Sequence, residues 1–185
     1  MQQIQRRTFS SLVSYSNSAN PRAFITVASG DKTVGKIVFE LYADKQASAV
    51  DNFQALVDGS ASDGRSYVGT TFASGMAGLG VRAGKTCEEG LGAWGVFNTD
   101  GDLSLRHHKR GMLSYVTHGD QQIGSEFTMT FGAAPTLDGY QTVFAEMVEG
   151  DSVLAEIEAA TDRHGQVNQE FKVVEAGMLW RTISW

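Results

Sequence analysis

The segment best suited to chemistry is "GLGVRAGKT", residues 78–86, which comes within one residue of a phosphate-binding loop. Such a loop needs a glycine five residues before its Gly-Lys-Thr, so that backbone N–H groups surround the phosphate, and Leu79 stands there. A looser glycine pattern of dinucleotide sites also fits, but it requires a helix after the loop. The following "CEEGLGAWG" has three glycines in nine residues, and each costs a helix interior about 1 kcal/mol. The sequence therefore predicts neither a nucleotide site nor a cofactor.

Two histidines and an acidic stretch could in principle bind a metal ion, but neither has suitable spacing. His107 and His108 are adjacent, and adjacent side chains of a strand point to opposite faces. We expect His107 to be structural and His108 to be solvated. The stretch "NTDGDLS" places Asn98, Asp100 and Asp102 at calcium-loop spacing, yet leucine and lysine follow where an EF-hand requires glycine and glutamate. No metal site is predicted.

The sequence gives little support for nucleophilic catalysis. Ser74 and Ser125 could combine with His118, but no carboxylate partner is identifiable. The only cysteine is Cys87, which excludes an internal disulfide and a cysteine-based metal site.

The charge balance excludes some partners. The chain of 185 residues has 15 basic and 21 acidic residues, and Arg6, Arg7 and Arg22 are the only charged residues among the first thirty. The rest of the chain is therefore strongly acidic and would repel nucleic acid and anionic membranes. No apolar run approaches the roughly 20 residues that cross a bilayer, so we expect no transmembrane segment.

Residues 1–19 differ in composition from the rest. They contain two arginines, six serines or threonines and no acidic residue, which is typical of a mitochondrial transit peptide. The stretch "RRTFSS" also resembles the sites where such peptides are cut. A disordered polar tail is the alternative, and the prediction is a mitochondrial location.

From residue 20 onward the pattern is that of a β domain with two helices. "AFITVASGDKTVGKIVFELY" predicts a hairpin around Gly30, with Ile37, Phe39 and Leu41 on one face of its second strand. Further strands are expected at "GMLSYV", "SEFTMTF", "QTVFAEM" and "EFKVVEAGML".

The two helices are predicted from their ends and their apolar spacing. Ser48 and Asp51 form a capping pair at the start of the first helix, and Gly59 ends it. The second helix starts near Asp151 and buries Val153, Leu154, Ile157 and Ala160. Numerous strands with two helices and glycine-rich connections indicate an all-β barrel capped at its ends.

Long stretches of the chain resemble a cyclophilin. "NPRAFITVASGDKTVGKIVFELYADKQASAVDNFQAL" is similar to the opening of that family, and "GMLSYVTHGDQQIGSEFTMTF" with "LDGYQTVFAEMVEGDSVLAEIE" is similar to its second half. The resemblance covers residues 20–179 in register. It implies a closed, eight-stranded antiparallel barrel with an α-helix at each mouth, and membership of a family of peptidyl-prolyl isomerases.

In the register of that resemblance, nearly every residue of the family's active site is substituted. "GLGVRAGKT" falls on the strand and turn beside the proline pocket, where Phe72 is retained and Ser74 replaces the catalytic arginine. The other replaced positions are Leu79 for an aromatic wall residue, Arg82 and Glu126 for two glutamines, Thr117 for an asparagine, Thr128 for the phenylalanine of the pocket floor, Thr136 for a tryptophan and Gln141 for a histidine.

Three functions remain open from the sequence. One is a non-catalytic cyclophilin-like module, a structural or accessory subunit that binds other proteins of a mitochondrial assembly. A second is a working isomerase in which Arg82 supplies the missing guanidinium, and the third is peptide binding without turnover. We also expect Arg82 and Glu126 to form a salt bridge within roughly 4 Å, which would fill the former proline site.

The ends of the chain are candidates for partner binding. The family pattern finishes near residue 179, and the tail of residues 180–185 ends the chain with two further tryptophans. Exposed tryptophan is typical of interface anchors. We expect the tail and the segment before Pro21 to touch another chain or the barrel surface, with these candidate contacts: Arg6, Arg7, Phe9, Trp180 and Trp185.

Overall fold

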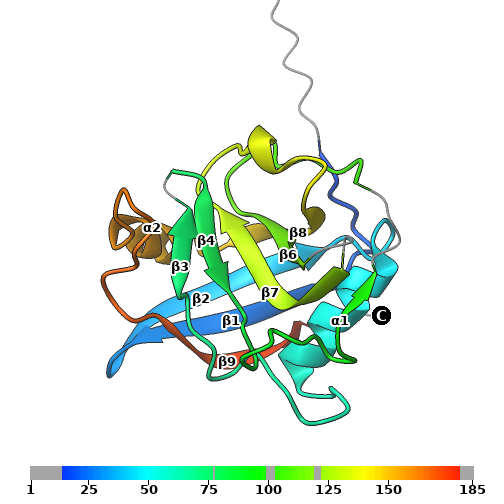
Figure 1. The fold of residues 1–185 in the computed structure, drawn as a ribbon, viewed down its shortest axis with the longest axis horizontal. Helices are drawn as coiled ribbons and strands as arrows, with labels where there is room; N and C mark the ends of the chain where they lie inside the picture. Colours follow the sequence, from blue (N-terminus) through cyan, green and yellow to red (C-terminus); the bar gives the residue numbers. More distant parts are fainter. Residues whose placement is uncertain (1–13, 77, 99–102, 119–121, 180–185) are drawn as a thin grey trace, which may run out of the picture.

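The computed structural model describes residues 14–76, 78–98, 103–118 and 122–179 (Figure 1). The strands in chain order are β1 (Arg22–Ser29), β2 (Lys32–Leu41), β3 (Ser74–Met76), β4 (Gly80–Ala83), β5 (Phe97–Asn98), β6 (Met112–His118), β7 (Gln122–Thr130), β8 (Thr142–Glu149) and β9 (Lys172–Leu179). The helices are α1 (Ala47–Asp58), the short 3-10 helix η1 (Pro135–Leu137) and α2 (Asp151–Ala159).

The strands form one curled antiparallel sheet in the order β3-β4-β7-β6-β8-β2-β1-β9, with β5 paired to β7 outside this path. The sheet is a half-barrel, because among the described residues its edge strands β3 and β9 do not pair with each other. The predicted closed barrel is therefore wrong in this respect. The chain just before β3 reaches β9 only through an isolated bridge between Thr71 and Lys172 and neighbouring hydrogen bonds such as Phe72 N–H to Phe171 O, 2.9 Å.

The predicted hairpin is confirmed. β1 pairs with β2 around Gly30, whose φ of 56° lies in the left-handed region that glycine tolerates. Ile37, Phe39 and Leu41 are fully buried, because alternate residues of a strand share a face and this face lines the half-barrel.

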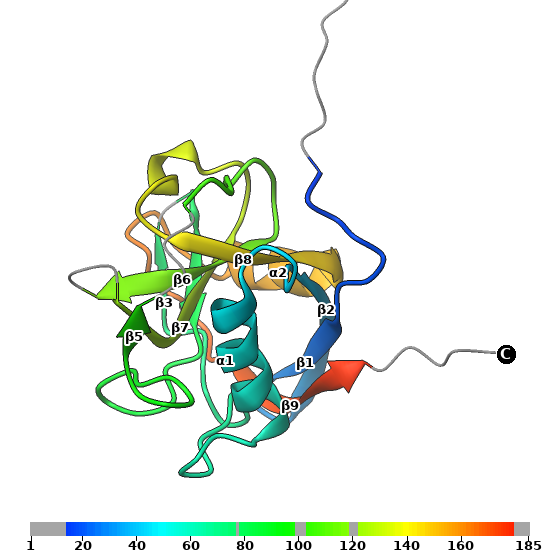
Figure 2. The ribbon, with the colours of Figure 1, turned by 90° about the vertical axis from the view of Figure 1, so that its right-hand side faces the viewer.

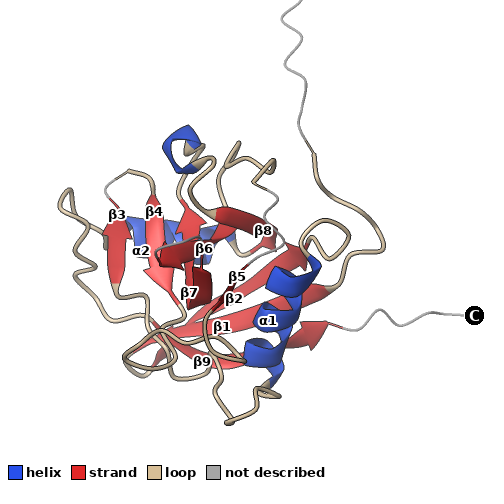
Figure 3. Ribbon diagram, turned by 45° about the vertical axis from the view of Figure 1, so that its right-hand side comes forward, coloured by secondary structure: helices blue, strands red, loops and turns tan. Residues whose placement is uncertain are grey.

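The two helices lie on opposite sides of the half-barrel, as Figure 3 shows. Both were predicted, and α1 ends at Gly59 in the left-handed conformation. Its start was not predicted correctly: the N-cap residue is Gln46, without a side-chain capping hydrogen bond, instead of Ser48. Helix α2 begins at Asp151 as expected and buries Val153, Leu154 and Ile157.

The core is centred on Phe53 of α1, which is fully buried. Its ring lies 5.1 Å from the ring centroids of both Tyr67 and Phe144, and 5.7 and 6.0 Å from those of Phe127 and Phe39. These distances are typical of favourable aromatic pairs, so one helical side chain connects four parts of the fold.

Residues 14–20 form a strap on the surface of the half-barrel (Figure 2). The Tyr15 ring packs edge-on against Tyr42 and His108, at centroid distances of 5.7 and 5.1 Å. The Glu40 carboxylate accepts hydrogen bonds from Ser16 Oγ at 2.9 Å and from Asn17 N–H at 2.7 Å. The described part of the segment before Pro21 thus contacts the barrel surface, one of the two contacts expected for it.

The other candidate partner contacts, Arg6, Arg7, Phe9, Trp180 and Trp185, lie outside the described residues. So do Asp100 and Asp102 of the calcium-like stretch. Within the described ranges, neither helix has the length and apolar character needed to cross a bilayer.

Candidate functional site

Four residues on neighbouring strands form a row across one face of the sheet. Ser74 on β3 is the direct partner of Arg82 on β4, which is the partner of Thr128 on β7, and Thr128 is the partner of Ser114 on β6. Directly opposed residues of antiparallel strands share a face with Cβ atoms about 4.5–5.5 Å apart. We call these four residues the polar row. It brings together three of the positions singled out from the sequence.

A cavity of about 240 Å³ opens beside the polar row. Its lining consists of Thr71, Ala73, Ser74, Arg82, Ala83, Lys85 and Glu126. Two cations and one carboxylate therefore face a common space, which is large enough for several water molecules or a side chain.

The predicted salt bridge between Arg82 and Glu126 is absent, and that prediction is wrong. Across the described residues, the ion pairs within 4.0 Å do not include Arg82, Lys85 or Glu126. Glu126 lies diagonally from Arg82, two residues from its strand partner Thr128, and such diagonal positions are about 7–8 Å apart. A partly solvated pair gains only about 0–1 kcal/mol, so little free energy favours closing that gap.

Beyond Arg82, the polar row continues with buried polar side chains. Thr128 is fully buried, and its hydroxyl has no hydrogen-bond partner among the described residues. Gln141 is also buried, and its Oε1 accepts a hydrogen bond from Ser114 Oγ at 2.8 Å. Gln141 is therefore held by the last residue of the polar row, on the side away from Arg82.

Three other positions singled out from the sequence, Leu79, Thr117 and Thr136, are not in the cavity lining. Leu79 forms the turn between β3 and β4, and its carbonyl accepts the Phe131 N–H at 2.9 Å. Thr117, near the end of β6, donates its hydroxyl to Tyr140 O at 2.6 Å. Thr136 lies in η1 and is exposed.

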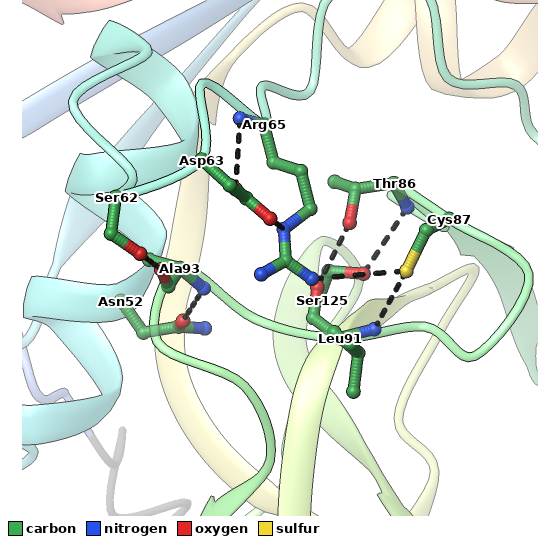
Figure 4. A network of polar contacts seen from close by, with 9 residues as sticks. All are labelled: Asn52, Ser62, Asp63, Arg65, Thr86, Cys87, Leu91, Ala93 and Ser125. Atoms are coloured by element: carbon green, nitrogen blue, oxygen red, sulfur yellow. Dashed lines mark hydrogen bonds and ion pairs between the residues drawn. The ribbon is translucent and has the colours of Figure 1, made fainter.

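The loop after β4 is fixed by a network of polar contacts (Figure 4). The Thr86 N–H donates to Ser125 Oγ at 3.2 Å, and the Thr86 hydroxyl donates to Leu91 O at 2.8 Å. Cys87 Sγ accepts the Leu91 N–H at 3.3 Å and faces an Arg65 nitrogen at 3.8 Å. The Ser125 side chain therefore stabilises the loop after β4. In the described residues 85–98, which follow Gly84, the chain forms turns, bends and β5 and no helix.

Arg65 in turn is anchored by its neighbour Asp63. Its Nε lies 2.6 Å from an Asp63 carboxylate oxygen, and this hydrogen bond lowers the pKa of the Asp63 carboxyl group. At the far end of the same loop, Asn52 of α1 accepts the Ala93 N–H at 2.8 Å. The loop that carries Lys85 is therefore held at both ends by the folded domain.

The two histidines have different surroundings. His107 is buried, with Nδ1 2.8 Å from an Asp138 carboxylate oxygen, as expected of a structural histidine. Burial lowers the pKa of His107, and the Asp138 carboxylate partly offsets this effect. His108 is half-buried against Tyr15, so the expectation that it is solvated is wrong. The described residues contain no group of three or more His, Cys, Asp or Glu able to hold a metal ion.

Lys85 is the charged residue of the cavity that the sequence interpretation missed. Lys85 is the lysine of the Gly-Lys-Thr pattern in the sequence. Its location beside Arg82 in the cavity depends on the path of the loop, which the sequence pattern does not show. Thr71 and Ala73, just before β3, also line the cavity and carried no signal in the sequence.

The curled antiparallel sheet with its two α-helices has the architecture of a cyclophilin-type domain. Residues 24–178 match the family model described as cyclophilin type peptidyl-prolyl cis-trans isomerase/CLD. The chain therefore belongs to the cyclophilin-type peptidyl-prolyl isomerase family.

Proposed function

We propose that this cyclophilin-type domain does not catalyse prolyl isomerisation and serves as a binding module. The polar row carries this proposal, because it presents a serine at Ser74 and a small buried threonine at Thr128. Rotation about an X-Pro bond faces a barrier of about 18–20 kcal/mol, since amide resonance must be broken. A charge aimed at the twisted amide lowers such a barrier, and a neutral serine hydroxyl supplies none. A threonine floor also lacks the aromatic surface that would hold a proline ring.

A second function has one observation in its favour. Arg82 is the direct cross-strand partner of Ser74, so its guanidinium starts from the strand next to the vacated position. Among the described residues, Arg82 also forms no ion pair within 4.0 Å. An isomerase that uses Arg82 would still have to hold proline over Thr128, which makes this the weaker candidate.

Refolding of a small protein limited by an X-Pro bond tests the two functions. We expect the proline-limited phase, about 10–100 s at 25 °C, to keep its uncatalysed rate when the protein is added. Ser74→Arg alone should also give no acceleration, because the pocket floor remains polar. An ordinary cyclophilin at the same concentration provides the positive control. Acceleration by the unmodified protein that Arg82→Ala abolishes would establish the second function instead.

We further propose that the module is an accessory subunit of a mitochondrial protein assembly. The transit-like composition of residues 1–19 and the tryptophans of residues 180–185 support this proposal. Removing residues 180–185 should release the protein from its assembly, seen as a shift to the monomer position in native gels of mitochondrial extracts. Circular dichroism of the truncated protein should be unchanged. An unaltered native-gel position, or a location outside mitochondria, would contradict this proposal.

A further inference from the structure

The charged side chains of the cavity lack partners of their own. Arg82, Lys85 and Glu126 line it, and none forms an ion pair within 4.0 Å with any described residue. Arg82 Nε is buried, and no described residue forms a hydrogen bond with it. Four other described arginines, Arg22, Arg65, Arg106 and Arg110, do pair with carboxylates, and Arg110 lies 2.6 and 2.5 Å from Asp151 and Glu158. The guanidinium of Arg82 and the ammonium group of Lys85 are thus available to bind an anionic group in the cavity.

The backbone brings the two cations together. Arg82 is the β4 member of the polar row, between Ser74 and Thr128, and Lys85 follows three residues later in the loop. Between them, Gly84 has a φ of 82°, and a Cβ there would lie 2.7 Å from ring atoms of Phe127 and Tyr67. Only glycine lets the chain turn this close to the sheet, so Lys85 stays beside the cavity that Arg82 lines.

The balance of charge favours an anion over a cation as the occupant. The lining has two positive side chains and one negative one, and the hydroxyls of Ser74 and Thr71 can also donate hydrogen bonds. A guanidinium binds a carboxylate through two parallel N–H bonds, and a lysine ammonium adds a second, more flexible charge. Glu126 repels an anion and can accept a hydrogen bond from a backbone N–H that accompanies a peptide carboxylate.

We propose, on the basis of the binding function above, that this cavity holds the carboxylate of an acidic peptide side chain between Arg82 and Lys85. An aspartate or glutamate of a partner protein enters beside the polar row, and the peptide backbone lies toward Glu126. The site thus binds an acidic side chain next to the place where the family's isomerases bind proline. A free anion such as phosphate shares this chemistry and is the other source of the same charge.

Titration of the ¹⁵N-labelled protein at constant ionic strength tests this proposal by NMR. The probes are the blocked tripeptide Ac-Ala-Glu-Ala-NH₂, its glutamine counterpart and inorganic phosphate. We expect the glutamate peptide to shift the Arg82 side-chain N–H and the Lys85 amide, with affinity at least tenfold above that of the glutamine peptide. Arg82→Gln and Lys85→Gln should each weaken binding about tenfold or more. Glu126→Gln should strengthen it several-fold, because it removes a repulsive charge.

Lys32→Gln is the matched control, since it removes the same charge from the β1–β2 hairpin, outside the cavity lining. It should leave the affinity unchanged. Phosphate binding with the same dependence on Arg82 and Lys85 would support the anion site with a free anion as its occupant. Equal binding of both peptides, no binding, or no effect of the cavity variants would overturn the proposal. If Arg82→Gln fails to fold, the affinities of Lys85→Gln and Glu126→Gln test the proposal. These binding measurements are independent of the refolding assay that tests the proposed function.

Discussion

Phe53→Ala lowers the free energy of unfolding by about 3–5 kcal/mol, the range found when a fully buried phenylalanine is truncated in a core. The ring is completely buried and contacts the rings of Phe39, Tyr67, Phe127 and Phe144. Removal of the ring leaves a cavity between α1 and three strands. The surrounding side chains can fill this cavity only in part. Equilibrium unfolding in urea, with the m-value checked for two-state behaviour, measures the loss.

Phe24→Ala is the matched control for this experiment. Phe24 lies on the outer face of β1, half-buried, with Lys36 Nζ 3.9 Å from its ring centroid. An exposed cation–π contact contributes about 0.5–1 kcal/mol, so the same truncation should cost about 1 kcal/mol here. Equal losses for the two variants would show that Phe53 is not the centre of the core.

The spacing of apolar residues predicts those helices and strands whose residues are buried at regular intervals along the sequence. Ile37, Phe39 and Leu41 alternate and are fully buried, and α2 begins at Asp151 with its apolar residues at helical spacing. Such segments have a pattern that depends on their own sequence alone. The capping pair at Ser48 was wrong because the helix starts at Ala47, so that its N-cap is Gln46, two residues before Ser48, without a side-chain capping hydrogen bond.

Strands β3 and β4 show no such pattern. β3 is Ser-Gly-Met and β4 is Gly-Val-Arg-Ala, and pairing with β7 determines their extended conformation. Only the family register indicated a strand there. The open edge of the half-barrel likewise depends on how β3 meets β9, residues nearly a hundred positions apart, which no local pattern specifies.

The sequence pointed to some residues of the candidate site, but not to all of them and not to their contacts. The register of the resemblance identified Ser74, Arg82 and Thr128, and the strand pairing places them side by side. The Arg82–Glu126 bridge was expected from opposite charge and from the register of the resemblance, in which both residues replace glutamines of one pocket. Neither shows the diagonal offset of the two positions in the strand pairing. Lys85 was missed because its place depends on the loop after β4.

Gly124→Ala destabilises the protein by about 3 kcal/mol, at the upper end of the range for overpacking. A Cβ at Gly124 would lie 2.0 Å from the carbonyl oxygen of Gly90, a backbone atom that cannot rotate away. The loop lies directly on β7 here, since the Ser125 N–H donates to that same Gly90 oxygen at 2.8 Å. Asn52 Nδ2 also donates to Gly124 O at 2.9 Å, which prevents the strand from moving aside.

The alanine therefore has to displace the loop that carries Lys85, and unfolding in urea should show the loss of stability. Hydrogen exchange should show faster exchange of the Thr86 and Leu91 amides, whose acceptors belong to this network. Gly132→Ala is the control, because a Cβ at Gly132 would meet no atom within 4 Å, and it should change stability by no more than about 0.5 kcal/mol. If Gly124→Ala behaves like this control, the loop is not held against β7. The variant is expected to alter binding of the glutamate peptide only by displacing the loop. Weakened peptide binding by Gly124→Ala with unchanged, slow hydrogen exchange of the Thr86 and Leu91 amides would therefore also contradict this prediction.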